Sequence, residues 1–115
     1  MGATPATHAA DDIEALPFVG VTAIVRDASI DALYTGMTDA LRAAGYRDGE
    51  TVRLRFDNAD ADAGRAAQLV KSFSTERADV IVAFTDPSAR IAAGERLRTP
   101  LVIAGVGPET ANDLR

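Results

Sequence analysis

The sequence predicts a three-layer α/β/α domain built on a four-stranded parallel sheet. Short apolar runs recur four times along the 115 residues, and each of the first three is followed by a polar turn and a helix-like stretch. This change of hydrophobic period at each junction is typical of βαβ units. The four predicted strands are residues 18–25, 52–56, 80–84 and 101–106.

The character of each apolar run predicts its place in the sheet. Residues 18–25 and 80–84 are continuously apolar, as expected for central strands that are buried on both faces. Residues 51–56 alternate between polar and apolar side chains, which predicts an edge strand with one wet face. Right-handed crossovers then give the strand order 2-1-3-4, which is the flavodoxin-like order.

Three helices are predicted between these strands, over residues 30–44, 62–77 and 87–97. Gly45 is placed to end the first helix in the left-handed conformation. Asp60 or Asp62 is expected to cap the second helix. Asp86 is expected to cap the third, with Pro87 at its first position.

The chain divides into three parts. Residues 1–16 are expected to be a mobile leader, 17–107 a single α/β lobe, and 108–115 a C-terminal tail too short and polar to cover a sheet face. Such a tail would leave the last strand as an open apolar edge, and an open edge favours pairing with another chain. We therefore expect a homodimer, formed through these edges or by two copies that face each other.

Composition argues against several classes of partner and cofactor. The net charge of −5 argues against nucleic acid or an anionic membrane surface, and no segment has the run of about 20 apolar residues that membrane insertion requires. With no cysteine and one histidine, neither a metal site nor a disulfide is expected. No glycine-rich phosphate loop follows the first strand, so no cofactor is expected.

An aspartate-rich run at residues 57–62 resembles the start of a calcium-binding loop. Asp62 and Gln68 stand where such a loop needs glycine and glutamate, which favours helix capping over metal binding. A small enzyme that uses Asp57 or Asp86 ranks lowest, because no general acid or base partner is apparent in the sequence.

Ligands of parallel α/β sheets gather beyond the carboxyl ends of the strands. The polar segments that follow the first three strands are therefore the candidate ligand-binding region, with helix N-termini directed toward it. The candidate residues are Thr22, Ala23, Asp27, Asn58, Thr85, Asp86 and Ser88.

The order of short motifs over residues 19–106 resembles one protein family. The most specific piece is Gly-Tyr-x-x-Gly at residues 45–49, followed later by Asp-Val-Ile-Val-Ala at 79–83. These motifs resemble the first lobe of ABC-transporter substrate-binding proteins of the tryptophan/tyrosine type. Asn58 matches the family pattern, whereas Ala23 stands where glutamine is usual and Asp86 where threonine is usual.

The resemblance implies a non-catalytic solute-binding lobe for a small polar or amino-acid-like ligand. It also implies a periplasmic or extracytoplasmic location and, as partners, a transporter permease or a second lobe, while the sequence by itself leaves a cytoplasmic location open. The alternative is a structural, interaction or sensor domain of the same ancestry that has lost its ligand.

Overall fold

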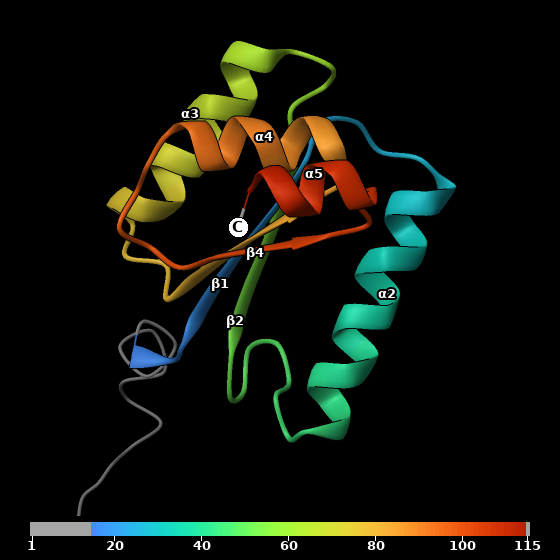
Figure 1. Ribbon diagram of the computed structural model, residues 1–115. Helices are drawn as coiled ribbons and strands as arrows, with labels where there is room; N and C mark the ends of the chain where they lie inside the picture. The colour runs from blue at the N-terminus through green and yellow to red at the C-terminus, as the bar shows by residue number, and fades with distance from the viewer. Residues whose placement is uncertain (1–14, 115) are drawn as a thin grey trace, which may run out of the picture.

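The computed structural model describes residues 15–114, and it shows four strands that alternate with helices (Figure 1). Most of the predicted leader lies outside the described residues. None of the helices in the described part is long and apolar enough to cross a membrane. The elements are β1 (Phe18–Ala23), α2 (Ala28–Ala43), β2 (Arg53–Asn58), α3 (Ala63–Thr75), β3 (Val80–Phe84), α4 (Asp86–Gly94), β4 (Leu101–Ala104) and α5 (Pro108–Asp113).

The sheet has the predicted topology. Its four strands are all parallel, in the order β2-β1-β3-β4. Every residue of β1 is buried, as its continuous apolar character predicts for a central strand. The predicted edge position of β2 is confirmed as well.

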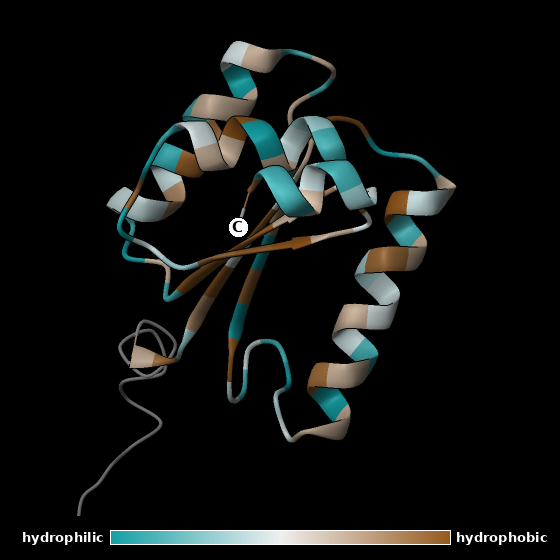
Figure 2. Ribbon diagram, viewed as in Figure 1, coloured by the Kyte–Doolittle hydropathy of each residue, from teal (hydrophilic) through white to brown (hydrophobic). Residues whose placement is uncertain are grey.

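Helices cover the two faces of the sheet unequally. α3, α4 and α5 lie over one face, whereas α2 alone lies over the other (Figure 1). Phe73 of α3 packs with Phe18 and Ile81 in the core of the first face, and Ile30 of α2 packs with Val21 and Phe84 in the core of the second. Hydrophobic residues dominate β1, β3 and β4, whereas β2 and the helices also carry hydrophilic residues (Figure 2).

The strand boundaries differ from prediction by a few residues. β2 begins and ends later than predicted, because Val52 forms an isolated bridge with Asp48, and its carbonyl accepts a hydrogen bond from the Gly49 N–H at 2.8 Å. At its other end the polar residue Asn58 still pairs with β1. β1 ends at Ala23 rather than at residue 25, and β4 ends before Gly105, whose φ of +69° bends the chain.

The helix boundaries follow from their caps. α2 begins two residues earlier than predicted because the Asp27 carboxylate accepts a hydrogen bond from the Ile30 N–H at 2.9 Å. Asp62 caps α3 as one of the two predicted candidates, and Gly45 after α2 has the expected positive φ of +95°. α4 ends at Gly94, three residues earlier than predicted, and Arg96 beyond it has a φ of +53°.

The predicted C-terminal tail is partly helical. The Arg90 guanidinium of α4 donates hydrogen bonds to the Thr110 hydroxyl and to the Asp113 carboxylate of α5, both at 3.0 Å. Thr110 is buried, and Leu114 packs against the core of the α3 and α4 face. Residues 108–114 thus pack on the lobe, whereas the sequence predicted a tail too short and polar to cover a sheet face.

The predicted wet face of β2 is only partly exposed: all six residues of the strand are half-buried, and the side chains of Arg55 and Asp57 are exposed by 41% and 36%. The Arg53 guanidinium lies 3.9 Å from the centroid of the Phe18 ring, and that of Arg55 lies 5.4 Å from the centroid of Phe73. Long arginine side chains thus cover aromatic rings with their stems and planar heads, which alternation alone does not reveal.

Candidate functional site

The register of the sheet brings the candidate residues to one edge. Ala23 lies opposite Asn58 of β2 and Phe84 of β3, and Phe84 lies opposite Ala104 of β4. The segments that follow these strands therefore leave the sheet side by side. We call this edge the carboxyl rim, and it comprises residues 22–27, 58–62, 85–88 and 105–107.

Four of the seven candidate residues at the carboxyl rim are exposed or half-buried, and Asp27 and Asn58 are two of them. Asp27 is exposed and caps α2. Asn58 is half-buried, and its side-chain oxygen accepts a hydrogen bond from the Asp60 N–H at 2.9 Å. This bond fixes which end of the amide is the oxygen, so the Asn58 NH₂ group remains as a donor.

Thr85, at the junction of β3 and α4, has an unusual backbone. Its φ of +73° and ψ of 167° lie in a region that is almost confined to glycine, and Thr85 is β-branched. Two hydrogen bonds hold it there: its N–H donates to the Ala104 carbonyl at 2.8 Å, and its carbonyl accepts from the Ala89 N–H at 3.0 Å. Strain held in this way gathers at functional sites.

Asp86 does not cap α4, contrary to the sequence-based prediction. The cap position belongs to Thr85, and Asp86 is the first residue of the helix. The Asp86 carboxylate instead accepts a hydrogen bond from the Gly107 N–H at 3.0 Å. It therefore ties the start of α4 to the loop that follows β4.

The other three candidate residues lie beneath the surface of the carboxyl rim. Thr22, Ala23 and Ser88 are exposed by 1%, 0% and 2%. The hydroxyl oxygens of Thr22 and Ser88 are buried without any hydrogen-bond partner. A buried polar group of this kind is destabilising by about 1–3 kcal/mol, and the low exposure of Thr22 and Ser88 places their hydroxyls beneath the surface that a ligand would contact.

Sequence reasoning did not identify the fold of the loop after β2. Asp60 and Ala61 have φ values of +51° and +65°, and the loop turns back toward β1. The Ala59 N–H donates to the Ala23 carbonyl at 2.9 Å, and the Ala61 N–H donates to the Ile24 carbonyl at 2.8 Å. The available signal was Asn58, because asparagine side chains fold back on the backbone two residues later.

Replacement of Thr85 by glycine tests whether the backbone conformation of this residue lowers the stability of the fold. We expect Thr85→Gly to raise the free energy of unfolding by about 1 kcal/mol, because glycine adopts this conformation without steric penalty. The matched control is Thr35→Gly in the exposed part of α2, which should lower stability by about 0.5 kcal/mol. Urea denaturation measures both changes, and a loss of stability in both variants would contradict the strain.

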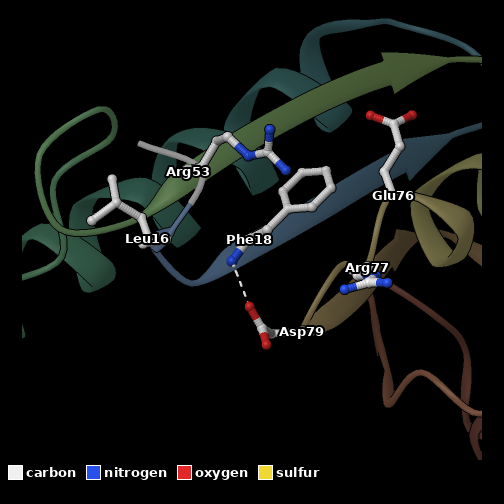
Figure 3. Close-up of a pocket in the computed structure, with 7 residues that line it drawn as sticks. Leu16, Phe18, Arg53, Glu76, Arg77 and Asp79 are labelled. Atoms are coloured by element: carbon white, nitrogen blue, oxygen red, sulfur yellow. Dashed lines mark hydrogen bonds between the residues drawn. The ribbon is translucent and has the colours of Figure 1, made fainter. Parts of the chain in front are cut away.

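A second concave region lies at the opposite end of the sheet. A cleft of about 550 Å³ opens there (Figure 3). The sequence did not predict this cleft, because the residues that line it come from separate segments and form no motif. Within residues 15–114 there is no cluster of three or more histidine, aspartate or glutamate residues that could hold a metal ion. The cleft is lined by Ala15, Leu16, Phe18, Arg53, Glu76, Arg77 and Asp79.

Comparison with known proteins assigns the family. Residues 18–114 match the family model described as ABC transporter substrate binding protein. The chain belongs to this family. The predicted family resemblance is thereby confirmed, and so is the α/β fold that it implied.

The relatives include proteins named for amino-acid ligands. A tyrosine-binding protein of Clostridioides difficile strain R20291 is 28% identical over 88 residues, which are 76% of this chain and 26% of that protein. A Streptococcus pneumonia structure, described as an ABC domain in complex with L-Trp, has a TM-score of 0.76 and 28% identity, covering 85% of this chain and 33% of that one. The ligand-free, open structure of a Clostridium difficile substrate-binding protein with adhesive properties has a TM-score of 0.77 and 30% identity, covering 84% and 32%. The chain thus spans about a quarter to a third of the length of these relatives.

Proposed function

We propose that this chain is a non-catalytic solute-binding lobe that holds a small polar or amino-acid-like ligand at the carboxyl rim. One observation carries the proposal: the parallel register gathers Ala23, Asn58 and the strained residue Thr85 at a single edge. Parallel α/β sheets bind their ligands at this edge. Membership of the substrate-binding family supports the same role.

The carboxyl rim offers partners for both ends of an amino acid. The NH₂ group of Asn58 can donate to a carboxylate. The carboxylates of Asp27 and Asp86 each accept one backbone N–H, from Ile30 and Gly107, and can also accept from an ammonium group. The names of the relatives make L-tyrosine and L-tryptophan the first ligands to test.

A single rim contacts only one side of a ligand. We therefore expect weak binding by this chain alone, with a dissociation constant in the millimolar range, which corresponds to about −4 kcal/mol. A second lobe would supply the other side of the site, and a transporter permease would receive the ligand. In this proposal the lobe works in an extracytoplasmic compartment.

A solute titration tests the proposal. Thermal-shift assays and ¹H–¹⁵N spectra are recorded with L-tyrosine, L-tryptophan and glycine, since a ligand bound only by the folded state raises its stability. We expect amide shifts to cluster at residues 22–27, 58 and 85–88. Shifts confined to residues 45–51, at the other end of the sheet, would contradict the site.

The sharpest variant is Asn58→Asp. It keeps the oxygen that accepts from the Asp60 N–H but removes the NH₂ donor and adds a negative charge, so amino-acid binding should weaken at least about fivefold. Asn112→Asp on the exposed side of α5 makes the same chemical change away from the carboxyl rim. Equal weakening in both variants would point to a general charge effect instead of a site.

The alternative role is that of a structural or interaction domain. In this role the chain would bind a partner through the outer edge of the sheet. β4 has no strand on its far side among the described residues, and Val102 on this strand is 50% exposed. We propose that two chains pair as a homodimer that buries about 1,600 Å². Sedimentation at micromolar concentration should show the dimer, and a monomer at every concentration would contradict it. A dimer that no solute stabilises would favour this alternative.

A further inference from the structure

The cleft at the amino ends of the strands is built from three segments. Leu16 and Phe18 enter β1, Arg53 begins β2, and the turn between α3 and β3 contributes Arg77 and Asp79. Figure 3 shows the Arg53 guanidinium directed toward the Phe18 ring, with Arg77 in the same cleft. This end of the sheet is opposite to the carboxyl rim, so the cleft is separate from the proposed solute site.

Arg53 is held in place but incompletely bonded. Its guanidinium stacks 3.9 Å from the Phe18 ring centroid, and its Nε atom is buried without a hydrogen-bond partner. A guanidinium has five N–H donors and no acceptor; the Nε–H has almost no accessible surface, so an anion in the cleft would contact the terminal NH₂ groups. The Phe18 ring covers one face of the Arg53 guanidinium. An acceptor can therefore approach only along the edge of the guanidinium, where the N–H groups point.

The nearby carboxylates are engaged by other partners. Both oxygens of Glu76 accept from the Arg55 guanidinium, at 2.8 and 2.7 Å, and one also accepts from the Ser72 hydroxyl at 2.8 Å. The Ser72 hydrogen bond and then that of Arg55 lower the pKa of Glu76. Asp79 accepts from the Phe18 N–H at 2.7 Å. Within residues 15–114, neither Arg53 nor Arg77 forms an ion pair.

We propose that this cleft binds a compact oxyanion, a phosphate or carboxylate group, between the guanidinium groups of Arg53 and Arg77. The fork of N–H donors on arginine matches the paired oxygens of both kinds of anion. A volume of about 550 Å³ is that of a small-molecule site, and the Phe18 ring preorganises one of the two cations. The site is independent of any amino acid at the carboxyl rim.

A titration with inorganic phosphate and with citrate, at ionic strength held constant with chloride, tests the proposal on the full chain. We expect the Arg53 Nε–H resonance to shift, together with the amides of residues 18, 53, 77 and 79. The two anions separate a phosphate preference from a carboxylate preference. Because the resonances of the carboxyl rim report the amino-acid titration separately, either site can fail without the other.

Four variants sharpen the test. Arg77→Gln, at an exposed side chain, should weaken oxyanion binding about tenfold without affecting folding, and Arg53→Lys should weaken it although the charge is kept. Glu76→Gln should tighten binding about threefold, because it removes a repelling charge. The control is Arg65→Gln, near the carboxyl rim, which should leave binding unchanged. The proposal is overturned if neither oxyanion shifts the Arg53 Nε–H resonance more than chloride does, or if Arg65→Gln weakens binding as much as Arg77→Gln.

Discussion

Replacement of Phe73 by alanine is expected to lower the free energy of unfolding by about 3–5 kcal/mol. The side chain is fully buried, meets the Phe18 ring edge-on at a centroid distance of 6.2 Å, and lies under the Arg55 guanidinium. Alanine would leave a cavity at the centre of the α3 face. Since domains of this size are stable by only about 5–15 kcal/mol, this is the largest single effect that we expect.

Urea denaturation followed by circular dichroism measures the loss. Val25→Ala is the control, because it also shortens an apolar side chain but at an exposed position in the loop after β1. Its effect should stay within about 0.5 kcal/mol. A loss below about 1 kcal/mol for Phe73→Ala would contradict the packing described here.

Replacement of Gly20 by alanine is expected to lower stability by about 1–3 kcal/mol through overpacking. A Cβ atom on Gly20 would lie 2.5–2.8 Å from three ring atoms of Phe73, so the ring or the strand would have to move. Gly36→Ala in α2 is the matched control, since its Cβ would meet no atom within 4 Å. That control should gain about 0.5–1 kcal/mol, because alanine is the better helix former.

A double-mutant cycle then identifies the cause. In a Phe73→Leu background the smaller side chain leaves room for the new methyl group, so Gly20→Ala should cost less than in the natural sequence. Equal losses in both backgrounds would mean that the glycine is needed for a reason other than contact with Phe73.

The strand order could be predicted from the sequence because the core strands are continuous apolar runs that tolerate few placements. The ends of elements could not be predicted in the same way. Asn58 belongs to β2 through its pairing with β1, although its polar side chain is typical of a loop. α5 depends on hydrogen bonds from Arg90, 20 and 23 residues earlier in the sequence, and such distant contacts leave no local pattern.

The candidate site likewise has features that the sequence predicts and features that it does not. Topology alone predicts which segments meet at the carboxyl rim, and the register confirms that they do. The burial of Thr22 and Ser88 and the backbone of Thr85 depend on how α4 packs, which no short motif records. The amino-end cleft was missed because alternation along β2 predicts that Arg53 faces solvent, whereas the arginine stacks on Phe18.

The hydrogen bond between Asp86 and Gly107 joins two segments of the carboxyl rim, the start of α4 and the loop after β4. An ammonium group bound to this carboxylate would share it with the Gly107 N–H, because the two oxygens of a carboxylate accept several hydrogen bonds. Ligand binding at the carboxyl rim would then change the environment of the Gly107 N–H, which is 21 residues along the chain from Asp86. Asp86 would in this way link ligand binding at residues 85–88 to the backbone of residues 105–107.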